Sequence, residues 1–553
     1  MATLLVLLAT ACAAAATPTR AAAATATRAA RRPGGARRSP RDGAALPPFG
    51  PSPPPPFAGN YSTKFFTQPR DHFNYFAPQT DDPSPTFQQR YLFDDQHWPG
   101  APYPIIFVTC VEAGPAPYYW GEYGFVVDTL ARNLSALLVF AEHRGFGVTA
   151  PAVAPGGDAR DWIPDAAHAG MLTEAQVLED FTALATSLRV NLSAWDSPLI
   201  ALGGSLAGEM AAWWRVRYPF MVDMALSASA PIFGFPGKTS TGAPLCDEFA
   251  WEAVVTDAFR TVGGDECVDF FRDGHTQTSA LSPAAVTAAF NTCTPATLPC
   301  HAGQVADLAL YWTETAAELG SYPASNASRS QTVWACSTMA GSETAVDAYV
   351  KLLAPRVPGE CLDIAWASCG AAARPRPAAA AAGFCATRWN DSTSGCQDGW
   401  GIESCTTEIH PISTNNVSDF FPPSAPFSEA DRQSGCRETY GSNLRTDGGA
   451  MPRSFGQLDL ARFAASASRI IFSSGTFDPW SSMSVKATLS PTLPFVNIVG
   501  GAHHSDIGNN FNPIPTPDDE PALIAARAFE TATLTSWVRD FHAERAAAKA
   551  RVV

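Results

Sequence analysis

The sequence predicts an α/β fold in which a parallel β-sheet domain is interrupted by a large helical insertion. Up to about residue 235, short apolar runs alternate with helical patterns. A stretch rich in Cys, Pro and Ser follows, and the strand-and-helix pattern returns after about residue 461. The chain has 553 residues, 46% of them hydrophobic, which is enough to bury the core of one large domain with an insertion.

Five short apolar runs predict the buried strands of this sheet. They lie at residues 105–108, 137–140, 199–202, 469–472 and 495–499. Thr173 and Gln176 form a capping-box pattern, which predicts a helix that runs to about Leu188. A final amphipathic helix is expected over roughly residues 521–542. Because strands alternate with helices, the sheet is expected to be parallel.

Composition divides the chain into four segments. Residues 1–56 begin with an apolar run and continue with Ala, Arg and Pro, which indicates a signal peptide and a disordered leader. An Arg-rich leader with no acidic residue before Asp42 also resembles an organelle transit peptide, so this alternative stays open. The α/β domain is then predicted at 57–235 and 461–553, with the helical insertion at 236–460.

Cysteines and glycosylation sequons favour the secretory pathway. Most cysteines lie between Cys246 and Cys436 without the paired spacing of a zinc site, so we expect disulfides. Six Asn-x-Ser sequons occur, at Asn60, Asn133, Asn191, Asn326, Asn390 and Asn416. The predicted location is therefore outside the cell or in a lysosome or vacuole.

The charge of the chain argues against two classes of partner. The formal net charge is −15, and residues 1–56 hold seven Arg but one acidic residue, so the rest is more acidic still. An acidic protein repels nucleic acid and anionic membranes. No stretch after the leader has the length and apolar character of a membrane span.

The predicted strand at 199–202 leads into a candidate nucleophile. The sequence there is GGSLAG at 203–208, and a helical pattern follows. A serine at the apex of such a turn is exposed and strained, and the adjacent helix N-terminus can stabilise an oxyanion. Ala207 takes the last small position of the G-x-S-x-G pattern. A structural Gly/Ser turn has the same local pattern, so Ser205 needs a base and an acid to support a catalytic role.

Asp478 and His503 are the candidate acid and base. Asp478 follows the predicted strand at 469–472, and His503 lies in a Gly-rich loop after the strand at 495–499. The order Ser, Asp, His is that of the α/β-hydrolase fold, and all three follow carboxyl ends of predicted strands. The sequence therefore predicts an α/β-hydrolase fold with an inserted, mainly helical, disulfide-rich cap. His504 is a rival base that spacing alone does not exclude.

Other residues are candidates for the oxyanion hole and for substrate binding. The backbone N–H of Leu206 is one expected oxyanion donor, and Val111 in the loop after the first predicted strand is the other. Glu112 is a candidate anchor for a substrate amine, although pairing with an arginine such as Arg144 is an equal alternative. Trp480, just after Asp478, is a candidate substrate-binding residue.

These motifs resemble those of the prolyl-carboxypeptidase and dipeptidyl-peptidase II family of serine peptidases. The matching stretches include FFTQ at 65–68, DHF at 71–73, TFQQRY at 86–91, VFAEHR at 139–144, SASAPI at 227–232, DPW at 478–480 and GAHH at 501–504. The resemblance implies a capped α/β-hydrolase that cleaves after proline or a small residue near a peptide terminus and prefers acidic pH. It also places the family's nucleophile, acid and base on Ser205, Asp478 and His503.

The sequence departs from the family pattern close to the predicted nucleophile. The family has Tyr and Gly where this chain has Leu206 and Ala207, and its first-strand loop has Gly-Asn where this chain has Cys110 and Val111. Because these positions border the predicted oxyanion hole, we expect the catalytic residues to be retained, whereas the resemblance leaves the substrate preference open.

The predicted function is that of a serine exopeptidase acting on short peptides, without a metal or an organic cofactor. Attack at the carboxyl or the amino end stays open, and the family resemblance makes a homodimer possible. One alternative is an esterase or lipase with the same fold, which long apolar cap helices would favour. Another is a non-catalytic, hydrolase-like binding protein.

Overall fold

The fold is that of a computed structural model. It describes residues 60–74, 85–109, 115, 119, 121–149, 169–320, 330–354, 361–362, 364, 399–508 and 514–552. Outside the described residues lie the predicted leader at 1–56, Cys110, Val111, Glu112, and the sequons at Asn326 and Asn390.

The described residues contain an eight-stranded sheet with the order β1-β2-β4-β3-β5-β6-β7-β8. The strands are β1 (Ser62–Pro69), β2 (Thr86–Asp94), β3 (Ile105–Val108), β4 (Leu137–Ala141), β5 (Leu199–Gly204), β6 (Met224–Ala228), β7 (Ile470–Gly475) and β8 (Phe495–Ile498). All five predicted strands are confirmed. The predicted strands belong to the parallel part of the sheet, as expected, whereas β2, which the apolar runs did not include, is antiparallel to both of its neighbours, β1 and β4. The remaining pairs are parallel, and this topology is that of the α/β-hydrolase fold, as predicted.

Helices cover both faces of the sheet, and alternate residues of each central strand enter two separate cores. Ile105 and Phe107 of β3 belong to the core that includes α4 (Glu174–Asn191) and α5 (Leu206–Arg217). Ile106 of the same strand faces the core that includes residues of α16 (Pro521–Val552). This period of two is what a strand buried on both faces requires.

Helix α16 is longer than its amphipathic pattern predicted. It continues ten residues past His542, through an Ala-rich segment of strong helix formers. In this extension the side chains of Arg545 and Lys549 form ion pairs with Asp196.

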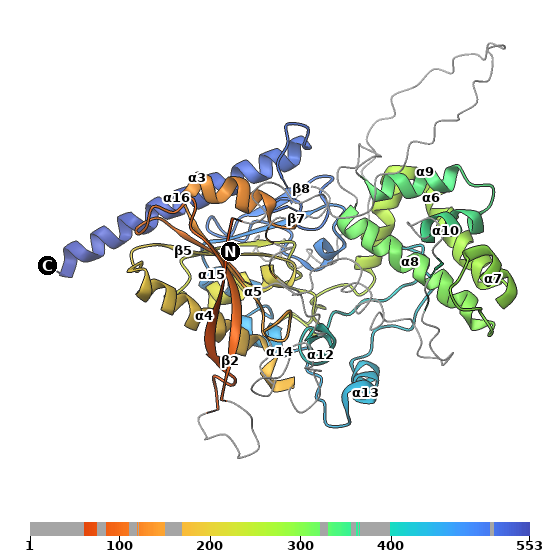
Figure 1. The fold of residues 1–553 in the computed structure, drawn as a ribbon, viewed down its shortest axis with the longest axis horizontal. Helices are drawn as coiled ribbons and strands as arrows, with labels where there is room; N and C mark the ends of the chain where they lie inside the picture. Colours follow the sequence, from red (N-terminus) through yellow and green to blue (C-terminus); the bar gives the residue numbers. More distant parts are fainter. Residues whose placement is uncertain are drawn as a thin grey trace, which may run out of the picture. The chain divides into compact units, whose positions relative to one another are not determined.

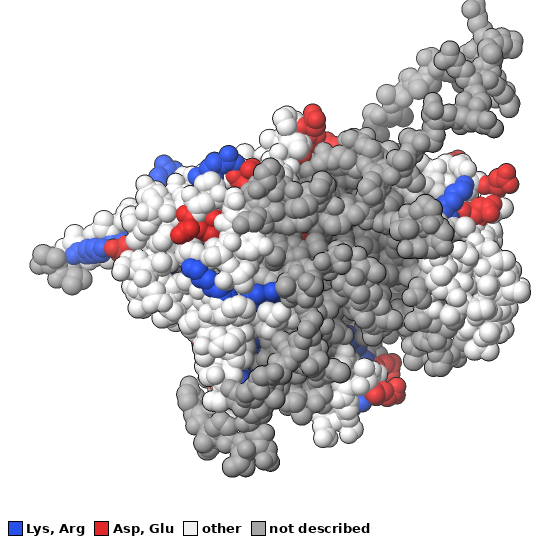
Figure 2. Space-filling view, viewed as in Figure 1, with Lys and Arg blue, Asp and Glu red and all other residues white. Residues whose placement is uncertain are grey.

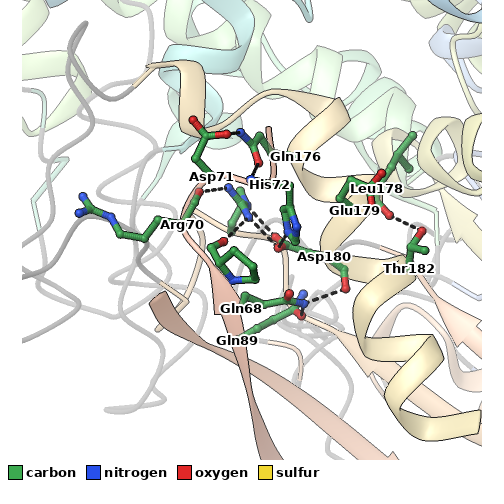
Figure 3. Close-up of polar contacts among 12 residues, drawn as sticks. Gln68, Arg70, Asp71, His72, Gln89, Gln176, Leu178, Glu179, Asp180 and Thr182 are labelled. Carbon is green, nitrogen blue, oxygen red and sulfur yellow. Dashed lines mark hydrogen bonds and ion pairs between the residues drawn. The ribbon is translucent and has the colours of Figure 1, made fainter. Parts of the chain in front are cut away.

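The predicted capping box at the start of α4 is not formed. Thr173 occupies the N-cap position, but its side chain accepts no hydrogen bond from the helix. Gln176 instead donates from Nε2 to Asp71 Oδ1 and accepts from the backbone N–H of His72 (Figure 3). The helix prediction is correct, and the glutamine that suggested a cap links α4 to the segment after β1.

The same face of α4 carries a buried ion pair that holds three segments together. Asp180 accepts from Nε and Nη2 of Arg144, both at 2.6 Å, and lies 2.7 Å from His72 Nε2. Arg144 also donates to the carbonyl of Arg70. Gln68 donates to the carbonyl of Asp180 (Figure 3). Arg144, which the sequence offered as a partner for Glu112, therefore has Asp180 as a carboxylate partner.

The cap contains a group of helices joined by disulfides. Its helices are α6 (Ala250–Ser279), α7 (Pro283–Phe290), α8 (Cys300–Gly320), α9 (Gln331–Ala340) and α10 (Ala345–Leu353), which gather around α6 (Figure 1). Disulfides join Cys267 to Cys336 and Cys293 to Cys361. A mainly helical, disulfide-rich cap is therefore confirmed.

The segment that leads back to the sheet contains four short helices. They are α12 (Gly399–Thr406), α13 (Glu429–Tyr440), α14 (Ala450–Phe455) and α15 (Leu460–Ser466). A disulfide joins Cys405 to Cys436. Phe455 stacks on Trp213 of α5 at a centroid distance of 4.8 Å. The hydrolase core thus takes residues from α14, although the sequence assigned 236–460 to the cap.

The surface carries four of the six predicted glycosylation sites. Asn60, Asn133, Asn191 and Asn416 are all exposed. On the face drawn in Figure 2, the described acidic and basic residues occur in small scattered groups. No helix in the described part of the chain is both long enough and apolar enough to span a membrane.

Candidate active site

Ser205 occupies a sharp turn between a buried strand and a buried helix. It follows β5 directly and is the N-cap residue of α5, with φ of 60° and ψ of −131°. A positive φ strains a residue that has a Cβ, and such strain persists only where the surroundings enforce it. The Ser205 N–H donates to the Ala228 carbonyl of β6 at 2.9 Å. This is the geometry of a nucleophile elbow.

The small residues around Ser205 are required by close packing. A Cβ at Gly203 would lie 2.3 Å from the Ala207 carbonyl carbon, and one at Gly204 would lie 2.9 Å from the Cβ of His504. Ala207 is buried beside Gly203, so its methyl group fits because position 203 has none. The alanine that departs from the G-x-S-x-G pattern is therefore compatible with the elbow.

Asp478 and His503 form a buried hydrogen bond at the carboxyl ends of two neighbouring strands. Asp478 follows β7 and caps the short helix η4 (Pro479–Met483) by accepting from the Trp480 N–H. The same oxygen, Oδ1, lies 2.9 Å from His503 Nδ1, which therefore donates to it. Both side chains are almost fully buried. The imidazole is thus held in the tautomer that presents Nε2 to a nucleophile.

The electrostatics of this pair favour the protonated imidazole. Burial alone lowers the pKa of His503, but the charge of Asp478 and the hydrogen bond to it outweigh burial and raise the pKa to about 9. Glu318 and Glu122 contribute in the same direction. The site therefore stabilises the protonated form of His503, which is the form that a general base passes through.

His504 has a different environment from His503. Its ring nitrogen Nδ1 lies 2.9 Å from the Gly508 carbonyl, and its backbone N–H donates to Ser229 Oγ at 2.7 Å. Burial and the neighbouring His503 lower its pKa. A base needs a carboxylate to orient it, and it is His503 that makes a hydrogen bond to Asp478.

The cap contributes two groups that the sequence did not single out. The carbonyl of Glu318 in α8 accepts from the His503 N–H at 2.8 Å, and its carboxylate accepts from Trp480 Nε1 at 2.8 Å. Glu318 Oε1 also lies 3.8 Å from His503 Nε2. Glu318 precedes His503 by 185 residues and lies in an ordinary helical pattern, so no local signal marks it.

Trp480 lies between the candidate base and the cap. Its ring is 6.4 Å from that of His503, 5.7 Å from that of Trp251 in α6 and 5.2 Å from that of His410. This aromatic surface beside His503 suits the apolar part of a peptide.

The described part of the predicted oxyanion hole is the start of α5. Leu206 is the first residue of this helix, and the N–H groups of a first helical turn have no partner within the helix. The other predicted donor, Val111, and the predicted substrate residue Glu112 lie outside the described residues.

A separate buried group in the described part of the chain has the composition of a metal site. It consists of Glu209, Glu408 and His410, with one ligand atom of each within 4.8 Å of the others. It is distinct from the hydrogen bond between Asp478 and His503.

A comparison with known families covers most of this chain. Residues 68–530 match the model of the family described as serine carboxypeptidase S28. The chain belongs to this family. The match includes both parts of the sheet domain and the cap, so the S28 assignment applies to the whole capped hydrolase.

Curated relatives agree with this assignment. Lysosomal Pro-X carboxypeptidase of Mus musculus is 30% identical over 89% of this chain and 92% of its own length. The protein of the same name from Homo sapiens is 30% identical over 90% of this chain and 92% of its own length. Prolyl carboxy peptidase like protein 5 of Caenorhabditis elegans is 27% identical over 82% of this chain.

As a member of the S28 family, the protein is a serine peptidase, and an exopeptidase function fits its relatives. The lysosomal names of those relatives agree with the location in the secretory pathway predicted from cysteines and sequons.

Proposed function

We propose that Ser205, His503 and Asp478 form the catalytic triad of this S28 peptidase. The observation that carries the proposal is the buried hydrogen bond from His503 Nδ1 to Asp478, at the same sheet edge as the strained Ser205 turn. Gly204, next to Ser205, packs closely against His504, so the loop that carries His503 lies beside the turn that carries Ser205.

The proposed reaction is acyl transfer through a covalent intermediate. Ser205 Oγ attacks the scissile carbonyl while His503 Nε2 takes its proton, and Asp478 stabilises the resulting imidazolium. The oxyanion is held by the Leu206 N–H, with Val111 as the proposed second donor. His503 then protonates the leaving amine, which departs. Water deprotonated by His503 attacks the acyl-enzyme and restores the serine.

The proposed substrates are short peptides cleaved after proline at the carboxyl end. The names of the curated relatives support this choice, and the aromatic surface of Trp480 offers a proline ring an apolar contact. Glu112 is retained as a proposed substrate residue. The cap would restrict access to peptide ends.

A second candidate is removal of an amino-terminal dipeptide. Two carboxylates lie near the paired histidines: Glu318 Oε1 is 3.8 Å from His503 Nε2, and Glu122 Oε2 is 4.0 Å from His504 Nε2. Carboxylates attract a free α-ammonium group and repel a terminal carboxylate.

A labelling experiment tests the proposed nucleophile. A fluorophosphonate probe should label the purified protein at pH 5 or pH 7 and should not label Ser205→Ala. The control is Ser481→Ala, which removes another serine near Asp478 and should leave labelling intact. Equal labelling of Ser205→Ala would contradict the proposal.

Blocked peptides identify the end that is attacked. For a carboxypeptidase, an N-acetylated peptide with a penultimate proline should be cleaved, and its C-terminal amide should be cleaved much more slowly. The opposite pattern would replace the first candidate with the aminodipeptidase.

A further inference from the structure

A buried group of acidic side chains lies against the helix that starts at Ser205. Glu209 is in the first turn of α5, four residues after Ser205, and its N–H donates to the Ser205 carbonyl. Glu408 and His410 follow α12 in the segment that returns from the cap. Both glutamates are 1% exposed. This group therefore joins the hydrolase helix to the return segment in a largely buried site.

The distances within the group suit a single bound cation. Glu209, Glu408 and His410 each offer one ligand atom, all within 4.8 Å of one another. Nε2 of His410 lies 3.8 Å from Oε2 of Glu408. Ligands bound about 2.1 Å from one tetrahedral cation lie roughly 3.4 Å apart, so small side-chain movements would complete the site.

The orientation of His410 leaves its Nε2 available as a ligand. Nδ1 lies 2.8 Å from the Gly234 carbonyl, and because a carbonyl only accepts, Nδ1 carries the hydrogen. A neutral ring then has its lone pair on Nε2, directed toward Glu408. Metal-binding histidines are commonly held by such a bond from the second nitrogen to a carbonyl. A Cβ at Gly234 would lie 2.9 Å from Nδ1, so a glycine permits this approach.

Among the described residues, Glu408 has no basic or neutral donor beside it. Its carboxyl group can share a hydrogen bond with that of Glu174 when one of the two is protonated, and no other donor in the described part of the chain reaches its oxygens. The charged groups that act on it are Glu209, Glu174 and Glu403, all of them acidic. An uncompensated buried carboxylate is strongly destabilising, so Glu408 requires either a proton or a cation.

His143 repeats the pattern beside Glu403, one of the acidic residues that act on Glu408. Its Nδ1 lies 2.5 Å from the Arg144 carbonyl and donates to it, while Nε2 lies 3.4 Å from Glu403 Oε1. In the described part of the chain, Nε2 of His143 has no hydrogen-bond partner, and the ring is fully buried. A lone pair facing a carboxyl group is a second sign that positive charge or protons belong here.

We propose that Glu209, Glu408 and His410 bind a divalent cation of the zinc class. Two carboxylates and one imidazole match the ligands of Zn²⁺, whereas Ca²⁺ takes six to eight oxygen ligands and Mg²⁺ retains water. The site is structural, because it shares no residue with the proposed triad. It would fasten the return segment to α5 and fix His410, whose ring is 5.2 Å from that of Trp480.

Zinc binding to the purified full-length protein tests this proposal. The protein is treated with a chelator, the chelator is removed, and ZnCl₂ is added at neutral pH. Metal content after gel filtration should be one zinc per chain, with a raised Tm. Glu209→Gln and His410→Gln should each weaken zinc binding about 10- to 100-fold. MgCl₂ and CaCl₂ should give no comparable rise in Tm.

A matched control and a spectroscopic measurement complete the test. His275→Gln removes another histidine that pairs with a carboxylate, Asp307 at 3.0 Å, and should leave zinc binding unchanged. Should the glutamate variant fail to fold, zinc X-ray absorption on the unaltered protein should show nitrogen and oxygen ligands without sulfur. Three results would overturn the proposal: sulfur ligands, zinc binding that is unchanged in the folded variants, or a fully stable protein that takes up no zinc. The last result would mean that shared protons neutralise the buried carboxylates.

Discussion

His503 and His410 are both buried histidines near a carboxyl group, but their protonation equilibria shift in opposite directions. The pKa of His503 is raised to about 9, and burial lowers that of His410 to about 4. His503 Nδ1 donates to the carboxylate of Asp478, whereas His410 Nδ1 donates to the carbonyl of Gly234. The partner of Nδ1 thus decides whether a buried imidazole is prepared to accept a proton or stays neutral and can bind a cation.

The largest expected effect comes from removing the charge beside His503. Asp478→Asn keeps the shape of the side chain but takes away the carboxylate that stabilises the imidazolium. We expect the rate of fluorophosphonate labelling to fall by roughly 10³- to 10⁴-fold. Asp419→Asn, a buried aspartate in the return segment, is the control and should retain labelling. Similar rates in Asp478→Asn and the unaltered protein would remove Asp478 from the triad.

The pH dependence of the labelling rate provides a second test of the raised pKa of His503. Because the neutral form of His503 is the base, the labelling rate should rise with pH up to about 9. In Asp478→Asn the residual rate should reach its plateau at lower pH, toward the ordinary histidine pKa of about 6.5. The family resemblance led us to expect an acidic preference, which a base of this kind opposes. A profile that is flat above pH 6 would show that Asp478 does not raise the pKa of His503.

The same pKa shift has a defined effect on stability. The folded pKa of His503 lies above its unfolded value of about 6.5, so the protonated form stabilises the fold. This contribution is complete below about pH 6.5 and is lost as the pH rises through about 9. Urea unfolding across this range should therefore show a smaller pH dependence in His503→Gln than in the unaltered protein.

A methyl group placed against His410 should give a moderate effect. In Gly234→Ala the new Cβ would lie 2.9 Å from His410 Nδ1 and 3.0 Å from Met483 Sδ. Overpacking of this kind costs about 1–3 kcal/mol, which urea unfolding measures. Gly303→Ala in α8 is the matched control, because its Cβ would meet nothing within 4 Å. Equal stability of the two variants would mean that His410 is not held tightly by Gly234.

The smallest expected effect comes from Trp480, whose ring lies near those of both His503 and His410. Trp480→Phe keeps an aromatic ring but removes the Nε1 hydrogen bond to Glu318. A bond of about 1 kcal/mol corresponds to roughly a fivefold decrease in kcat/KM for a peptide substrate. Trp195→Phe, which alters an exposed tryptophan, should leave kcat/KM unchanged. No decrease in Trp480→Phe would show that the contact with the cap does not assist substrate binding.

The regular part of the fold was predictable because its determinants are local. The runs at 105–108 and 199–202 are apolar enough to require burial on both sides, and the glycines beside Ser205 mark a tight turn. Strand β1 was missed because most of its residues are exposed, and β2 was missed because polar residues such as Gln89 and Arg90, although buried, interrupt its apolar pattern. The order of Ser205, Asp478 and His503 was informative because carboxyl ends of parallel strands share one edge.

Contacts between distant segments were not predictable from local patterns. Glu318 reaches His503 from a helix of the cap, and nothing in its own helical segment distinguishes it from a surface glutamate. Glu209 and Glu408 are separated by 199 residues, so no ligand spacing could mark them. The sequence consequently predicted no metal, and the proposed zinc site rests on the folded arrangement alone.

The hydrogen bond from the His503 N–H to the Glu318 carbonyl has a consequence for how this enzyme can be altered. A cap that supplies a backbone acceptor to the base cannot be exchanged as a separate module. Grafting the cap of another S28 peptidase onto this sheet would replace part of the support of the imidazole. Changes in selectivity made through the cap should therefore bring changes in turnover with them.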